Sequence, residues 1–119
     1  MKLYKIMSTE KNPEDLLLIC SELIIAQSFI DKLFGLIFKT LKTGQGFAIR
    51  DCSSIHTCWM KYKIDVVFLN ERYEIIKLYE SFRQSRITPI INKANCVIEF
   101  PESTINNYLL KTGDMLKII

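Results

Sequence analysis

The spacing of the apolar residues changes from helical to strand-like at Gly46, and this change constrains the fold more than any other feature. Before Gly46, one apolar stripe recurs at helical spacing and consists of Ile30, Leu33, Phe34, Ile37 and Leu41. After Gly46, most of the remaining chain alternates apolar and polar residues with the period of two that is typical of strands. The pattern predicts a mainly β fold that contains little helix.

Two helices are expected. Ser28 and Asp31 have the spacing of a capping box, so the first helix is predicted over residues 28–41, and the glycines of the stretch 43–46 end it. A shorter second helix is predicted over residues 103–110. It is followed by a turn in which Gly113 suits a positive φ.

Strands are expected on both sides of the first helix. The apolar stretches Leu16–Cys20 and Glu22–Ala26 predict one strand or a tight pair of strands. After the helix the expected strands are Phe47–Cys52, Ile55–Met60, Ile64–Leu69, Tyr73–Tyr79, Ala94–Phe100 and Met115–Ile119. Ile64–Leu69 is apolar on both faces, which predicts a central strand, and Pro89 marks an edge strand or a bulge. We therefore predict one antiparallel β-sandwich or jelly-roll-like barrel, with an N-terminal strand and linker at 1–15 and a core domain at 16–119.

The apolar stretches are all shorter than the roughly 20 residues of a membrane-spanning helix. Lys2 and Lys5 interrupt any secretory leader before its apolar region begins, so a cytoplasmic location is expected. The four cysteines include no CxxC pair, which disfavours a disulfide framework and predicts Cys20 and Cys96 as core residues. No cofactor is expected, because the stretch 44–46 lacks the features of a phosphate-binding loop.

The small excess of positive charge is concentrated in one segment. The chain has 16 Lys and Arg against 13 Asp and Glu, and residues 39–63 account for the whole surplus. A net charge of +3 is too small to indicate nucleic-acid binding. The segment is either a locally uneven stretch of a mildly basic protein or a surface for an anionic ligand or a protein partner.

One group of residues could carry chemistry. A thiolate at Cys52, activated by His56 and oriented by Asp65, would suit acyl transfer, although the sequence shows no oxyanion hole. His56 and Cys58 could instead share a metal ion, but their spacing matches no known zinc module, so no metal site is predicted. The third interpretation is structural: His56 is hydrogen-bonded, and Asp65 is a buried carboxylate that meets Lys61, Arg50 or backbone amides. Glu99 is expected on the solvent face of its strand.

A set of motifs between the first helix and the last strand resembles the domain of unknown function 192 family. The matching residues are Gly35-Leu36, Ser54-Ile55-His56-Thr57, Trp59-Met60-Lys61, Ile64–Leu69, Arg86, Pro89, Val97-Ile98-Glu99-Phe100 and Gly113-Asp114. The resemblance covers roughly residues 16–119 and implies a compact β-sandwich or jelly-roll-like domain, without implying a reaction. The chain departs from the pattern at Ser103, where a Gly is usual, at Glu71-Arg72 and at Cys58.

The functional prediction is a non-enzymatic binding module. Its expected surface is the basic, aromatic-containing stretch around residues 39–63, with Lys42, Arg50, His56, Trp59, Lys61 and Lys63 as the binding residues. The alternative is a small Cys-His enzyme or metal-binding protein centred on Cys52 and His56.

Overall fold

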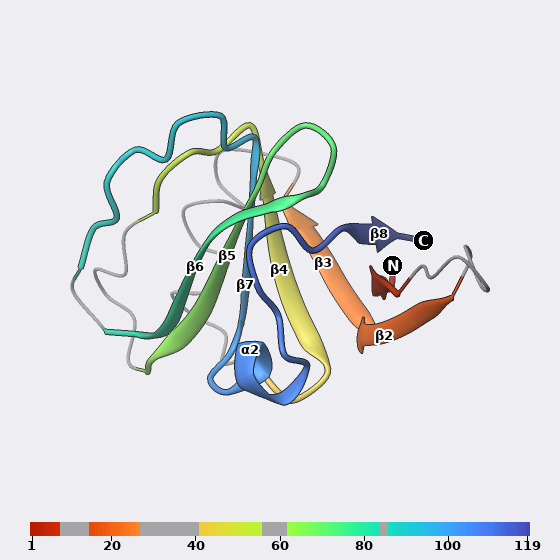
Figure 1. The fold of residues 1–119 in the computed structure, drawn as a ribbon. Helices are drawn as coiled ribbons and strands as arrows, with labels where there is room; N and C mark the ends of the chain where they lie inside the picture. The colour runs from red at the N-terminus through yellow and green to blue at the C-terminus, as the bar shows by residue number, and fades with distance from the viewer. Residues whose placement is uncertain (8–14, 27–40, 56–61, 84–85) are drawn as a thin grey trace.

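The computed structural model describes residues 1–7, 15–26, 41–55, 62–83 and 86–119, which form two β-sheets and one short helix (Figure 1). The smaller sheet has three strands in the order β2-β1-β8. These are β1 (Leu3–Ile6), β2 (Leu16–Cys20) and β8 (Leu116–Ile118). β1 pairs antiparallel with both neighbours, so the two ends of the described chain meet in this sheet.

The larger sheet has five strands in the order β3-β4-β7-β5-β6. They are β3 (Glu22–Ala26), β4 (Gln45–Arg50), β5 (Ile64–Leu69), β6 (Ile75–Phe82) and β7 (Cys96–Pro101). The expectation of an antiparallel architecture is wrong at one edge, because β3 and β4 pair in parallel. The connection between them, residues 27–44, is long enough for the crossover that a parallel pair needs. The strands form two open sheets and no closed barrel among the described residues.

The larger sheet separates two apolar clusters. One cluster fills the space toward the smaller sheet and the helix and includes Leu3, Val67, Ile98 and Phe100. The other lies on the opposite face and includes Phe47, Val66, Phe68 and Val97. Because successive residues of a strand point to opposite faces, β5 and β7 contribute side chains to both clusters. The prediction that Ile64–Leu69 is a central strand is confirmed, since all six residues are buried.

The expected helix over 28–41 and most of the expected strand over 55–60 lie outside the described residues. The helix expected over 103–110 is shorter than predicted: α2 covers Thr104–Asn107. It ends because Leu109 has a φ of 51°, which no right-handed helix accommodates. Pro89 lies in an irregular connection between β6 and β7 rather than in a strand of either sheet.

The turn between β5 and β6 is closed by a side chain. Asn70 keeps a negative φ, and Tyr73 has the positive φ of 58°. Asn70 acts through its side chain, whose Oδ1 accepts hydrogen bonds from the backbone N–H groups of Arg72 and Glu74 at 2.9 and 3.1 Å. A short polar side chain that bonds the backbone two residues ahead is sufficient to close such a turn.

Candidate functional site

Asp65 is one of the three residues predicted to form a nucleophilic site, and the structure gives it other partners. Its side chain is 1% exposed, on the face of β5 that points toward α2. Oδ1 accepts a hydrogen bond from the backbone N–H of Ser81, and Oδ2 accepts one from the backbone N–H of Ile105, both at 2.9 Å. The sequence suggested Lys61, Arg50 or backbone amides as partners of Asp65, and backbone amides are the donors that bind it. Both oxygens are thus engaged in holding the fold.

Cys52 lies away from Asp65. It is half-buried and packs against the apolar cluster on the opposite face of the larger sheet. Its Sγ donates a hydrogen bond to the carbonyl of Ser54 at 2.9 Å. Since the sheet separates Cys52 from Asp65, the structure does not bring these two members of the predicted triad together. The third member, His56, lies outside the described residues.

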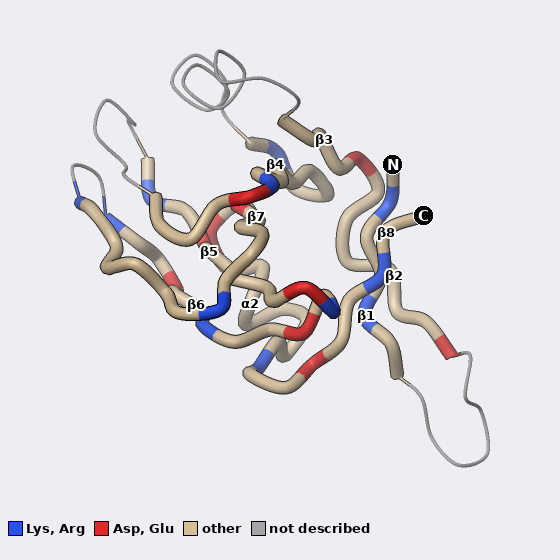
Figure 2. The backbone as a smooth tube through the Cα atoms, turned by 90° about the horizontal axis from the view of Figure 1, so that it is seen from above, with Lys and Arg blue, Asp and Glu red and all other residues tan. Residues whose placement is uncertain are grey.

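The predicted basic surface divides into two regions. Arg50 ends β4 beside Cys96, where β7 begins, whereas Lys63 directly precedes Ile64, which pairs with Pro101 at the other end of β7. Cys96 and Pro101 are five positions apart along β7, or roughly 17 Å at the rise of a strand. Lys42 precedes β4, at its end far from Arg50. In Figure 2 the Lys and Arg positions and the Asp and Glu positions are spread along the described backbone. Trp59 and Lys61 fall in the undescribed segment 56–61.

Glu99 was expected on a solvent face, and that prediction is wrong. β7 is the middle strand of five and is covered on both faces, so Glu99 is 4% exposed. Its cross-strand neighbours are Phe47 on β4 and Val66 on β5, and both belong to the apolar cluster on that face. Burial in these surroundings raises the pKa of the Glu99 carboxyl to about 8.

Tyr62 packs against the apolar cluster on the same face of the sheet as Glu99. Burial raises the pKa of its phenol and outweighs the hydrogen bond from the Leu41 backbone, which lowers it. The negative charge of Glu99 raises it further. Alternation along the strand could not predict that Glu99 is buried. It shows which residues lie on the same face of the strand, but not whether other elements cover that face.

Residues 86–93 form a second notable feature, which we call the 86–93 loop. Its backbone is fixed by two reciprocal contacts with the stretch that follows β4. Thr88 N–H donates to the Ile55 carbonyl at 2.9 Å, and Ile55 N–H donates to Thr88 Oγ1 at 3.0 Å. Ile91 N–H donates to the Ser53 carbonyl at 2.8 Å. These bonds attach the loop to one end of the segment predicted to bind a partner.

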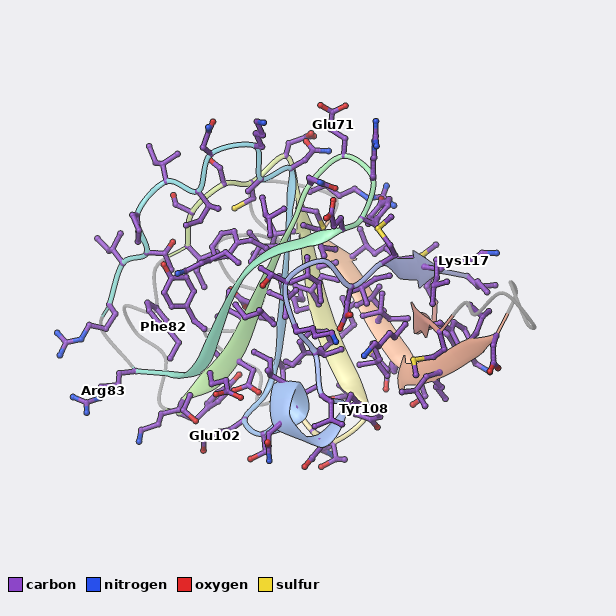
Figure 3. The ribbon with its side chains drawn as sticks, in the orientation of Figure 1. Glu71, Phe82, Arg83, Glu102, Tyr108 and Lys117 are labelled. Atoms are coloured by element: carbon purple, nitrogen blue, oxygen red, sulfur yellow. The ribbon has the colours of Figure 1, made fainter. Side chains whose placement is uncertain are left out.

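The 86–93 loop presents apolar side chains to solvent. Ile87 is 73% exposed and Ile90 is 79% exposed, on either side of the buried Thr88. Arg86 and Lys93 are exposed at the two ends of the loop. In Figure 1 the loop runs along the outer side of the molecule beyond β6, and in Figure 3 Arg83 projects outward from the end of β6 on that same side. The surface is apolar at its centre and cationic at its ends.

The described residues were compared with the requirements of a metal site and of a membrane-spanning helix, and they meet neither. Within these ranges, no three His, Cys, Asp or Glu side chains come together where they could hold a metal ion. Among the same residues, no helix is long and apolar enough to cross a membrane.

Comparison with known proteins places the chain in a family. Residues 11–118 match the model of DUF192, described as "Uncharacterized ACR". The chain belongs to the DUF192 family. Two archaeal relatives agree: the UPF0127 protein PH1112 of Pyrococcus horikoshii is 30% identical over 100 residues, covering 81% of this chain and 86% of the relative. The UPF0127 protein PF1050 of Pyrococcus furiosus is 28% identical, covering 81% and 85%.

Two solved structures share the DUF192 fold seen here. A Novosphingobium aromaticivorans protein of unknown function superposes with a TM-score of 0.79 at 13% identity, covering 99% of this chain and 84% of that one. A Sinorhizobium meliloti protein, provisionally assigned as a transcription regulator, gives a TM-score of 0.77 at 15% identity, covering 98% and 91%. At these identities the likeness concerns the fold alone, and the family carries no established activity.

Proposed function

We propose that this DUF192 domain is a binding module that contacts a protein partner through the 86–93 loop. The observation that carries the proposal is the exposure of Ile87 and Ile90 on a backbone that is fixed by hydrogen bonds. A fixed loop loses little conformational entropy on binding, so the apolar area that it buries contributes more of its free energy to affinity. Two isoleucines held in this way are suited to fill an apolar hollow on a partner.

The charges around the loop indicate the kind of partner. Arg86 and Lys93 are exposed at its ends, and Arg50 ends the neighbouring strand β4. An apolar hollow with an acidic rim would complement this surface, since complementary rim charges accelerate association and fix orientation. Of the residues predicted to bind, Arg50 belongs to the proposed surface. His56, Trp59 and Lys61 are also included, because they follow in sequence the stretch 53–55 that anchors the loop. Lys42 and Lys63 lie at the other end of the sheet and are not part of it.

A cytoplasmic location belongs to the same proposal. Cys20 and Cys96, two buried cysteines of the described residues, form no disulfide, which suits a reducing compartment.

Affinity capture with matched variants tests the proposed surface. The variant Ile87→Ser with Ile90→Ser removes the exposed apolar area, and Leu109→Ser is the control because Leu109 is 74% exposed on the connection after α2. We expect both proteins to have the melting temperature of the wild type. The proposal predicts that Leu109→Ser recovers the partner at wild-type levels and that the double variant loses at least about tenfold in affinity, in line with the cost of removing central interface residues. Equal recovery by both variants would contradict it.

A further inference from the structure

β2 forms one edge of the smaller sheet, and its sequence has none of the features that usually protect an edge strand. Its five residues, Leu16–Cys20, are all apolar and include no charge and no proline. Monomeric proteins usually prevent edge strands from pairing with another chain by charged side chains, by proline or by a covering element. A bulge at Ile19 leaves Leu16–Leu18 as the regular part of the edge. An apolar edge of this kind is a template for one more strand.

The backbone of β2 presents hydrogen-bonding groups along that edge. Met7 N–H donates to the Asp15 carbonyl at 2.8 Å, so Asp15 faces β1. Because the residues of an antiparallel strand alternate between its two sides, Leu17 also faces β1, and Leu16 and Leu18 direct their N–H and C=O groups outward. Within the described part of the chain, β1 is the strand that pairs with β2, and no backbone group bonds Leu16 or Leu18 from the outer side. Each of these two leucines therefore offers one donor and one acceptor to another strand.

Apolar side chains accompany these backbone groups. Leu17 is 38% exposed and Leu18 is 39% exposed, on opposite faces of the strand. Leu18 shares its face with Tyr4 on β1, and Leu16 shares the same face with Ile6. These four side chains, Tyr4, Ile6, Leu16 and Leu18, belong to neither apolar cluster of the fold. The smaller sheet is thus apolar next to its free edge.

We propose that this edge pairs with β2 of a second copy of the chain, in an antiparallel register centred on Leu17. In this register Leu17 meets Leu17 of the second copy on the two-fold axis. The outward groups of Leu16 and Leu18 then meet those of Leu18 and Leu16 in the second copy, so that every outward donor finds an acceptor. The leucine side chains lie directly opposite one another, and the apolar face next to the edge continues into the second copy.

Charge and symmetry favour a second copy as the occupant. The acidic residue that precedes the strand, Asp15, comes opposite Ile19 of the second copy, so no like charges face each other. Lys117, on the same face as Leu18, lies on β8 and is separated from the contact by β1. A charged partner strand would place its charges opposite leucines that cannot compensate them. A pair of short strands is a small contact, so the dimer should be reversible.

The proposed dimer leaves the 86–93 loop accessible. In Figure 1, β2 lies at one side of the molecule, and the loop runs along the other side, beyond β6. The two surfaces can therefore be tested independently.

Sedimentation equilibrium of the intact protein, from about 10 µM to about 1 mM, tests the proposal. We expect the average mass to rise with concentration from 13.9 kDa toward twice that value. Leu17→Glu and Leu17→Lys each place like charges on the two-fold axis and should each weaken association at least about tenfold. An equimolar mixture of the two variants should restore the dimer, because opposite charges then meet. Ile90→Glu is the control, since Ile90 is 79% exposed on the 86–93 loop, and it should associate as the wild type does.

Thermal unfolding followed by circular dichroism shows whether each variant is folded. If the Leu17 variants do not fold, Leu18→Pro is the second test, because it removes one outward N–H without removing a hydrogen bond within the sheet, and it should also weaken the dimer. The mass of a single chain at every concentration overturns the proposal, as does a mixture of the two Leu17 variants that stays monomeric. Association that survives Leu17→Glu, or that Ile90→Glu abolishes, also overturns it, because the contact would then lie elsewhere. A mass that continues to rise beyond two chains does so too, since pairing of the two edges closes the contact.

Discussion

The carboxylate of Asp65 accepts a hydrogen bond from the backbone N–H of Ile105, 40 residues further along the chain. Through its other oxygen it binds Ser81, where β6 carries an extra residue opposite Asp65 and a positive φ of 49°. One buried side chain thus joins the start of α2, the central strand β5 and the bulge of β6. Ser103, at the N-cap of α2, makes no side-chain cap, and Asp65 supplies an acceptor to the first turn of α2 from strand β5.

Replacing Asp65 is expected to lower the free energy of unfolding. Asp65→Ala leaves the amides of Ser81 and Ile105 buried without acceptors, at about 1–3 kcal/mol each. Asp65→Asn retains one acceptor oxygen and should lose about half as much. Urea unfolding followed by circular dichroism measures both. Equal stability of the alanine variant and the wild type would contradict the role assigned to Asp65.

Glycine at position 103 should stabilise the protein. Ser103 has a φ of 77°, a left-handed conformation that costs a residue with a Cβ roughly 1 kcal/mol relative to glycine. We expect Ser103→Gly to raise the free energy of unfolding by about that amount. Ser103→Ala keeps the Cβ, and because the serine hydroxyl makes no cap, it should have almost no effect. A destabilised glycine variant would show that the hydroxyl has a role we have not assigned.

The stability of the wild type should fall as the pH rises. The pKa of Glu99 is about 8 in the folded protein and 4.5 when unperturbed, so the folded state binds the proton more tightly. The stabilisation from this group is complete below pH 4.5 and is lost progressively up to about pH 8, by roughly 3 kcal/mol between pH 4.5 and 7 at about 1.4 kcal/mol per unit.

Glu99→Gln removes that titration. Its free energy of unfolding, relative to the wild type, should therefore increase from pH 5 to pH 8 by a similar amount, as measured by urea unfolding at each pH. Parallel pH profiles for the two proteins would show that Glu99 does not have a raised pKa.

The described thiols should differ in reactivity. Cys96 is 3% exposed, and burial raises its pKa to about 11, while burial also raises the pKa of Cys20. Cys52 is half-buried. Because alkylation requires an accessible thiolate, iodoacetamide at pH 8 should modify Cys52 well before Cys20 and Cys96 in the native protein, as followed by peptide mass spectrometry. Rapid labelling of Cys96 without unfolding would contradict the burial described here.

The sequence was informative wherever the relevant contacts are local or repeat along a strand. The apolar faces of Ile64–Leu69 correctly predicted a central strand, and Cys20 and Cys96 are core residues as expected. The family pattern has a glycine at the position of Ser103, and the structure shows the reason, because this residue has a φ of 77°. Family membership was also recognisable from the motifs.

The remaining features depend on contacts between distant segments. Glu99 alternates with apolar neighbours as a solvent-facing residue does, but strand order places β7 in the middle of the sheet and covers that side chain. The parallel pairing of β3 with β4 and the attachment of Thr88 to Ile55 likewise follow from topology rather than from periodicity. The separation of Cys52 from Asp65 by the sheet has the same origin.

Site-specific photo-crosslinking in living cells tests the central claim, that the 86–93 loop contacts a partner, most directly. A benzophenone amino acid at position 90 replaces a side chain that is 79% exposed, and the same substitution at Leu109, which is 74% exposed, is the control. We predict a discrete protein adduct on irradiation of the position-90 protein and none from position 109. The adduct should disappear when Ile87→Ser is added. Absence of an adduct at position 90, or the same adduct from both positions, would contradict the account.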